Sequence, residues 1–421
     1  MTLHRRRTHM PNWAIPAMYA VLAVLAGLLL PRLEATCFPG STSGLSPVAS
    51  MAIFSAVGSG MIALTGIVFS LAFVMLQFSA TAYSPRLVLW LANDRVLWHS
   101  VGVFSATFLY SIAAIAWVDR SGTGGTPFVS GWLVIALLLA SVGMFIALIE
   151  KISLLQVNRM LAFTTDHGRR VIEAMYSPLT AEPAMPDRDE YRKLPLTFAL
   201  YHVGAPRTVQ ALDVPTLRAL SKASGTVVIV VAAVGDTVVE GAEMLRVFGG
   251  RDAVDEKALR NAFELGSERT FEQDPKYALR LLVDIAIRAL SPAVNDPTTA
   301  VQALDQIEDL LRRLGGRRLE IGAFRDESGL RVVIPYPTWG DFLALAFDEI
   351  RYCGATSVQV MRRMKALIAD LVRALPPERH GALRDHQRRL EATVARSFPD
   401  AEELEDASIE DRQGLGTPRV R

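Results

Sequence analysis

Charged and amide side chains gather between residues 269 and 297, in a stretch that is otherwise rich in apolar residues. Guanidinium, carboxylate and amide groups at such density can bind a small polar ligand or an ion, or they can join helices through salt bridges. The candidate positions are Arg269, Gln273, Asp274, Arg280, Asp284, Arg288, Ser291, Asn295, Asp296 and Pro297. Three of them, Arg280, Asp284 and Arg288, recur every four residues and would share one helical face. Three interpretations remain open: an intramolecular salt-bridge network, a subunit contact, or a ligand site.

Two Asp-Pro pairs indicate how these side chains are positioned. In Asp274-Pro275 and in Asp296-Pro297, the carboxylate can accept a hydrogen bond from a free helix N–H, and the proline suits the first helical position. We therefore expect one helix over about residues 275–290 and a second over about 297–314, joined by the corner "SPAVNDP". Capping accounts for Asp296 and Pro297, but it does not require Asn295.

Mixed secondary structure is expected around this pair of helices. Runs of β-branched residues punctuated by glycine predict strands within residues 208–214, 225–234 and 235–249, with a short helix over 215–223. We also expect a helix over 255–268, strands over 317–324 and 330–335, and amphipathic helices after Trp339. The sequence thus predicts a mixed α+β domain with a small β-sheet or partial barrel and a C-terminal helical part.

Four long apolar stretches dominate the first third of the chain, at residues 13–30, 51–76, 96–118 and 131–149. None has an acidic or basic residue in its middle, and each is near or above the roughly 20 residues that a helix needs to cross a bilayer. The first stretch follows "HRRR", as a signal peptide would, but no small-residue cleavage pattern follows it, so we expect a retained helix. The chain is therefore expected to be an integral membrane protein whose N-terminal domain is an α-helical bundle of four transmembrane helices.

The placement of Lys and Arg predicts the orientation of these helices. Basic residues precede the first stretch, lie between the second and third, and follow the fourth, whereas the other two loops hold only Arg32 and Arg120. Because basic loops tend to stay in the cytoplasm, both termini are expected there. The predicted divisions are a transmembrane domain over 1–150, a helical extension of the fourth helix over 151–176, a linker over 177–195, a cytoplasmic α+β domain over 196–375, and a helical, acidic, partly disordered tail over 376–421.

The second apolar stretch carries small residues at helical spacing. They are Ala52, Ala56 and Gly60, followed by Gly66 and Ser70. Small side chains four residues apart allow two helices to approach closely in lipid. This row predicts either packing inside one bundle or a surface used between subunits, including a pore-lining helix.

Composition argues against several classes of function. The 421-residue chain has a formal net charge of +1, so we expect no nucleic-acid partner. Two cysteines and seven scattered histidines predict no disulfide framework, no metal site and no cofactor. The chain lacks the phosphate-loop, zinc-protease and nucleophile-elbow motifs, and we therefore expect no enzyme and no catalytic residues.

Three segments, "RTFEQDP", "LVDIAIRALSPAVNDPTTA" and "DFLALAFDEIRYCG", resemble the DUF2254 family of predicted bacterial membrane proteins. The resemblance covers most of the chain and implies a multi-pass protein of the bacterial inner membrane. It implies no activity and no catalytic residues.

Two functions are compatible with this architecture. One is an oligomeric, channel-like protein with a cytoplasmic regulatory domain. The alternative is a non-transporting sensor or scaffold whose cytoplasmic domain binds a small ligand or a protein partner. The expected partners are the lipid bilayer and further copies of the chain, and the ligand is not specified.

Overall fold

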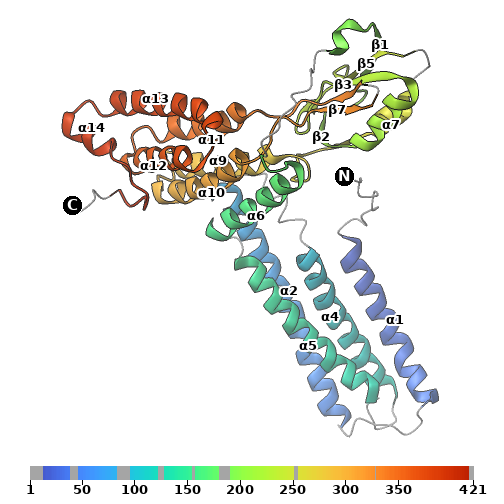
Figure 1. The fold of residues 1–421 in the computed structure, drawn as a ribbon. Helices are drawn as coiled ribbons and strands as arrows, with labels where there is room; N and C mark the ends of the chain where they lie inside the picture. The colour runs from blue at the N-terminus through green and yellow to red at the C-terminus, as the bar shows by residue number, and fades with distance from the viewer. Residues whose placement is uncertain are drawn as a thin grey trace. The chain divides into compact units, whose positions relative to one another are not determined.

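The computed structural model describes residues 13–37, 46–82, 95–121, 128–153, 157–179, 190–250, 255–327 and 329–416. The chain divides into two compact units, an apolar unit over Arg6–Gln156 and an α/β unit from Val157 onward. Figure 1 shows the ribbon of both. Most of the predicted linker, residues 180–189, and the last five residues of the predicted tail lie outside the described residues.

Long apolar helices make up the described part of the apolar unit. They are α1 (Ala14–Cys37), α2 (Pro47–Ala82), α4 (Arg95–Ser121) and α5 (Phe128–Ser153). By length and composition, four segments in them are able to cross a membrane: Ala14–Glu34, Pro47–Leu71, Arg95–Val118 and Phe128–Glu150. These segments coincide with the four predicted stretches. Helix α4 is central, because 44% of its most apolar window is buried, against 17–22% in the other three helices.

Polar side chains inside this unit find partners on neighbouring helices. The hydroxyls of Thr107 on α4 and Ser141 on α5 are 2.9 Å apart, and Tyr110 donates to Ser130 at 3.3 Å. The Glu34 carboxylate accepts the backbone N–H of Val129 at 3.0 and 3.1 Å, at the start of α5. These bonds join α4 and α1 to α5, as interhelical hydrogen bonds do where water is scarce.

Two small sheets form one part of the α/β unit. The first has five strands in the order β1-β5-β3-β8-β7, and the second has three in the order β4-β2-β6. Strands β3 and β8 are parallel, and the other pairs are antiparallel. The strands are β1 (Leu196–Tyr201), β2 (Arg207–Leu212), β3 (Thr226–Val230), β4 (Thr237–Val238), β5 (Glu243–Gly249), β6 (Phe263–Gly266), β7 (Ala323–Asp326) and β8 (Gly329–Val333).

Cross-strand apolar pairs fix the register of the larger sheet. Val228 on β3 lies opposite Val247 on β5 and Val332 on β8, while Leu200 on β1 lies opposite Leu245. All five side chains are at most 1% exposed. A shift of one residue would turn this apolar set to the other face, so burial specifies the pairing.

Helices form the rest of the α/β unit. Before and between the strands lie α6 (Val157–Met175), the 3-10 turn η1 (Glu190–Lys193), α7 (Val214–Ser224) and α8 (Glu256–Asn261). The later helices are α9 (Pro275–Ala289), α10 (Pro297–Gly315), α11 (Trp339–Cys353), α12 (Val358–Ala374), α13 (His380–Ser397) and α14 (Ala401–Ala407), with the turn η2 (Pro377–Arg379) before α13.

Helices α6, α9 and α10 meet at one glycine. A Cβ built on Gly168 of α6 would lie 2.9 Å from the Cβ of Ala278 on α9 and 3.0 Å from Leu310 on α10. Ala278 and Leu310 are themselves fully buried. The absence of a side chain at Gly168 therefore lets the three backbones approach closely.

The prediction of one helix over residues 255–268 was wrong. Helix α8 ends at Asn261, and residues 263–266 form β6, which pairs with β2 through Leu212↔Phe263 and Val209↔Leu265. Tertiary pairing overrides local helix propensity here, because Phe263 is buried as part of the sheet core. The predicted strands over 317–324 and 330–335 also differ from β7 and β8, since residues 317–322 precede β7 and are not in a strand.

Candidate functional site

The first group of candidate residues lies at the start of α9. Asp274 is the N-cap residue and accepts the backbone N–H of Tyr277, as predicted for its Asp-Pro pair. Arg269 donates from Nε to the Asp274 carboxylate at 2.7 Å, and its guanidinium lies 5.8 Å from the Tyr277 ring centroid. Asp274 is only 2% exposed. Burial raises the pKa of Asp274, and the charge of Arg269 opposes this shift.

Gly235, in the segment that connects β3 to β4, packs against this ion pair. Gly235 has φ +92°, a region that L residues rarely adopt, and a Cβ there would lie 2.5 Å from Arg269 Nη2 and 2.7 Å from Asp274 Oδ2. The turn before β4 therefore packs directly on the charged pair. This packing covers the Asp274 carboxylate, which is 2% exposed, while the Arg269 side chain stays 26% exposed.

Gln273 holds the end of β2 in place. Its side-chain carbonyl accepts the backbone N–H of Leu212 at 3.1 Å, and its amide nitrogen donates to the Leu212 carbonyl at 3.3 Å. One side chain thus satisfies both backbone groups of a residue at a strand end.

The second group lies in the middle of α9. Arg280 donates from Nε to Asp284 at 2.7 Å, and its terminal nitrogens pair with Glu349 on α11. The hydrogen bond to Arg280 lowers the pKa of Glu349. This arrangement joins α9 to α11.

The third group is the corner between α9 and α10. Ser291 donates to the carbonyl of Arg288 at 2.7 Å, and the N–H of Asp296 reaches the Ala289 carbonyl at 2.8 Å. Asp296 caps α10 through the N–H and hydroxyl of Thr299. Asn295 has φ +47°, the one positive value at a non-glycine residue in the described chain. Asparagine tolerates this left-handed conformation, so the turn itself requires a residue of that kind.

The ten candidate residues therefore do not form one cluster. The 15 residues of α9 separate the Asp274 end from the corner by about 22 Å at 1.5 Å per residue. The first group caps α9, the second joins α9 to α11, and the third forms the turn between α9 and α10. Of the ten candidate residues, only Gln273 lines the cavity that residues of α7 and β7 also line.

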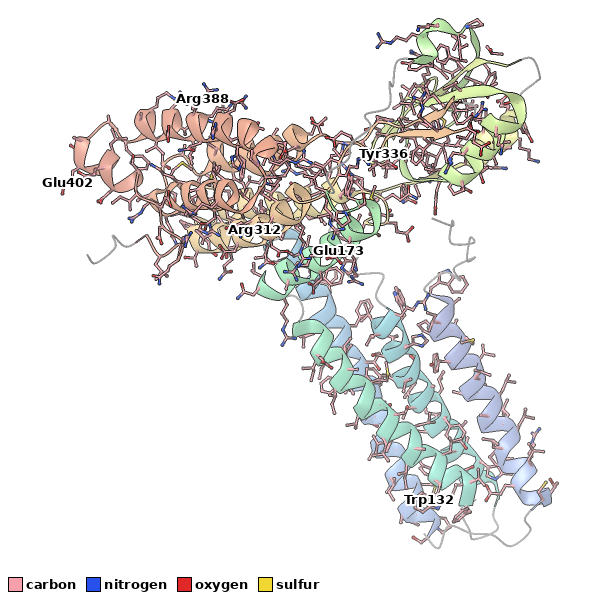
Figure 2. All side chains as sticks on the ribbon, in the orientation of Figure 1. Trp132, Glu173, Arg312, Tyr336, Arg388 and Glu402 are labelled. Carbon is pink, nitrogen blue, oxygen red and sulfur yellow. The ribbon has the colours of Figure 1, made fainter. Side chains whose placement is uncertain are left out.

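That cavity has a volume of about 540 Å³ and lies where α7, the end of α6 and the β7–β8 hairpin meet. Its walls include apolar side chains from four segments, among them Met175, Pro215, Ile321 and Phe324. Tyr336 also lines it, and Figure 2 shows this residue between the strands and the helices of the α/β unit. Burial raises the pKa of the Tyr336 hydroxyl, which keeps that group neutral.

Three basic side chains line the same cavity. Arg218 and Lys222 lie four residues apart on α7, and Arg331 comes from β8. Arg331 pairs with Asp326 at 2.8 Å. Arg218 lies 5.9 Å from the centroid of the Phe324 ring, and no ion pair involves Arg218 or Lys222 within the described ranges. The sequence analysis did not predict a site at Arg218 and Lys222, although the run "RALSK" places two basic residues four positions apart.

A second cavity of about 250 Å³ shares two wall residues with the first, Gln273 and Tyr336. Asp274, Lys276 and Asp341 also line it. Gln273 thus lines both cavities, and its side-chain amide is hydrogen-bonded to the backbone of Leu212.

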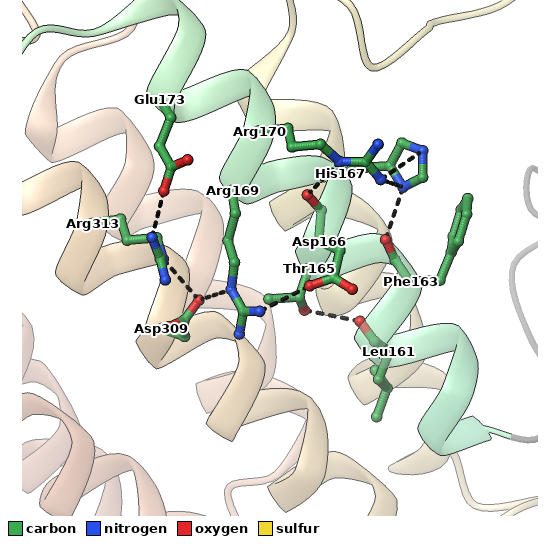
Figure 3. Close-up of polar contacts among 10 residues, drawn as sticks. All are labelled: Leu161, Phe163, Thr165, Asp166, His167, Arg169, Arg170, Glu173, Asp309 and Arg313. Atoms are coloured by element: carbon green, nitrogen blue, oxygen red, sulfur yellow. Dashed lines mark hydrogen bonds and ion pairs between the residues drawn. The ribbon is translucent and has the colours of Figure 1, made fainter.

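Helices α6 and α10 are joined by a further charged network that the sequence did not predict (Figure 3). Arg169 donates to Asp309 at 2.7 Å, and Arg313 contacts both Asp309 at 3.3 Å and Glu173 at 2.6 Å. These four side chains are 33–47% exposed. Exposed pairs of this kind stabilise a protein only slightly, so we regard the network as a brace between two helices.

The row of small residues lies on the outside of the apolar unit. Ala52, Ala56, Gly60, Gly66 and Ser70 are all exposed on α2. A Cβ on Gly60 or Gly66 would meet nothing within 4 Å. Packing inside the described part of a single bundle therefore does not account for this spacing.

Four apolar helices followed by a mixed α/β unit with small sheets define a predicted membrane protein with a large part outside its apolar helices. The chain belongs to the DUF2254 family, described as predicted membrane proteins, whose family model matches residues 10–370. Similar proteins are the uncharacterized protein Rv1290c of Mycobacterium tuberculosis and the uncharacterized protein Mb1321c of Mycobacterium bovis. Each is 29% identical over 398 residues, which cover 91% of this chain and 74% of the relative. No solved structure matches the chain.

Proposed function

We propose that this protein is a membrane-anchored, non-catalytic sensor whose α/β unit binds a small molecule in the cavity between α7 and the β7–β8 hairpin. The observation that carries the proposal is the cavity itself. Its volume of about 540 Å³ falls in the range of small-molecule sites, and its walls combine apolar surface with a few polar groups. Following the basic loops of the sequence, we infer that the α/β unit and both termini lie on the cytoplasmic side of a bacterial inner membrane.

Filling the cavity should abolish ligand binding. Ala219 lines the cavity from α7 and is exposed, so Ala219→Trp places a large ring inside the hollow with little strain on the helix. The full-length protein in lipid nanodiscs is screened by thermal unfolding against a library of bacterial metabolites. A compound at 100 times its Kd stabilises the wild-type protein by about 2.7 kcal/mol, and we expect Ala219→Trp to lose that stabilisation.

The control is Ala223→Trp, on an exposed position of α7 that does not line the cavity. It should respond to the same compounds as the wild-type protein. Equal stabilisation of wild type and Ala219→Trp by every compound found would rule out binding in this cavity.

A second candidate function, an oligomeric channel-like assembly, is favoured by the exposed small residues of α2. Small side chains on a lipid-facing helix permit close contact with another helix, and no helix of the same copy occupies this face in the described apolar unit. We propose that Ala52, Ala56 and Gly60 form a contact between copies. Ion conduction would then be a property of the assembly.

Enlarging Gly60 should dissociate such an assembly. We expect the wild-type protein in a mild detergent to have the mass of an oligomer, and Gly60→Leu to have the mass of a single chain, because the leucine side chain keeps the helices apart. The matched control is Gly143→Leu on α5, where the glycine is also exposed with nothing within 4 Å. A wild-type mass of one chain, or an unchanged oligomer in Gly60→Leu, contradicts this proposal.

A further inference from the structure

The cavity has an excess of positive charge. Among the described residues, Arg218, Lys222 and Arg331 line it together with a single carboxylate, that of Asp326. Asp326 is already paired with Arg331 at 2.8 Å. The charges of Arg218 and Lys222 are therefore not balanced by an acidic residue in the part of the cavity wall that the structure describes.

Some other helical arginines of the α/β unit pair with a carboxylate one turn away, whereas Arg218 and Lys222 do not within the described residues. Arg260 on α8 pairs with Glu256 one turn away, and Arg312 on α10 pairs with Glu308 in the same way. In α7 the residue four positions before Arg218 is Val214, and the residue four positions after Lys222 is Thr226, which lies outside the helix. The helix thus presents two cations along one face, toward the cavity, without a carboxylate of its own at that spacing.

Apolar and aromatic surface lies beside these charges. Phe324 forms one wall, with the Arg218 guanidinium over its ring, and Met175 and Ile321 add aliphatic surface. A flat apolar group can pack against such walls while its charged end reaches α7. A compact inorganic anion would leave most of the volume of about 540 Å³ unfilled.

We propose that the ligand of this cavity is a small organic anion with an aromatic or other flat apolar body, whose carboxylate, sulfonate or phosphate group is bound by Arg218 and Lys222. The inference rests on the proposed function and specifies its ligand class. Guanidinium and ammonium groups form charge-assisted hydrogen bonds with all three kinds of anionic group. The aromatic body accounts for the remainder of the cavity.

Matched probes test the charge requirement. Binding of 2-naphthoate, its neutral isostere 2-naphthamide and inorganic phosphate is measured by isothermal titration on the full-length protein in nanodiscs of uncharged lipid. We expect 2-naphthoate to bind at least about tenfold more tightly than 2-naphthamide, since the amide lacks the charge that the α7 cations recognise. Phosphate should bind more weakly than naphthoate, and naphthoate affinity should fall as salt is raised.

Charge variants identify the residues responsible. Arg218→Gln and Lys222→Gln should each weaken naphthoate binding by about five- to tenfold and leave naphthamide binding unchanged. The control Lys257→Gln removes the same charge from an exposed position of α8 outside the cavity, and it should have no effect. Because Arg218 and Lys222 are exposed, neither substitution should prevent folding.

The outcomes separate this inference from the proposed function. Equal binding of naphthoate and naphthamide, both lost in Ala219→Trp, overturns the anion inference and leaves a ligand site in place. Naphthoate binding that survives Ala219→Trp contradicts both. Absence of saturable binding by naphthoate and by phosphate up to about 10 mM also overturns the anion inference. The ligand site would still be supported by any metabolite that stabilises the wild-type protein but not Ala219→Trp.

Discussion

Asp274→Ala should lower the free energy of opening of α9 by about 3 kcal/mol, because it removes a helix cap and leaves the positive charge of Arg269 without its partner in a largely buried site. The carboxylate is 2% exposed and the Arg269 side chain 26% exposed. Water can therefore reach part of the guanidinium, and we expect the lower end of the range for broken buried pairs. Hydrogen exchange of the α9 amides, followed by mass spectrometry on the full-length protein, measures this change.

Asp296→Ala is the matched control for that prediction. Asp296 also precedes a proline, has nearly the same backbone angles as Asp274, and caps α10 through Thr299. It has no buried arginine in its hydrogen bonds, so only the cap is lost, at about 1 kcal/mol. Similar losses in the two variants would mean that the ion pair with Arg269 contributes nothing measurable.

Gly168→Leu should destabilise the packing of α6 against α9 and α10 by about 3 kcal/mol, since there is no space for the added carbons. Even a single Cβ would lie 2.9 Å from Ala278 and 3.0–3.1 Å from Leu310. Leucine favours a helix more than glycine does, but that gain of about 0.8 kcal/mol does not offset the steric overlap. Denaturant unfolding of the detergent-solubilised protein, together with exchange of the α6 amides, gives the value.

The same substitution at Gly381 provides the comparison. Gly381 lies in the first turn of α13, is exposed, and has nothing within 4 Å of a built Cβ. Gly381→Leu should leave stability unchanged or raise it by up to about 0.8 kcal/mol. Ala278→Gly should cost less in the Gly168→Leu background than in the wild-type protein, and equal costs would show that the close approach to Ala278 is not the cause.

Local signals predicted the elements that depend on local chemistry. The two Asp-Pro pairs place the starts of α9 and α10 at Pro275 and Pro297, and the structure confirms both caps. Apolar length alone identified the four long helices at the N-terminal end. In these cases the residue types and their spacing are sufficient, because capping and apolar periodicity need no information about distant parts of the chain.

Features that depend on distant residues were not predictable in this way. The segment Phe263–Gly266 becomes a strand only because β2, more than 50 residues earlier, offers it an unpaired edge. The cavity combines α7 with the β7–β8 hairpin, about 100 residues later in the chain. Arg218 and Lys222 were therefore visible as a spacing in the sequence but could not be assigned to a site.

Gln273 has a consequence for how the α/β unit can move. It holds Leu212, which immediately precedes Asp213, the cap of α7, and it is itself followed by Asp274, the cap of α9. The side chain of Gln273 thus links the start of α7, which carries Arg218 and Lys222, to the start of α9. We therefore expect a displacement of α7 at its start either to break both hydrogen bonds of Gln273 or to move the start of α9 with it.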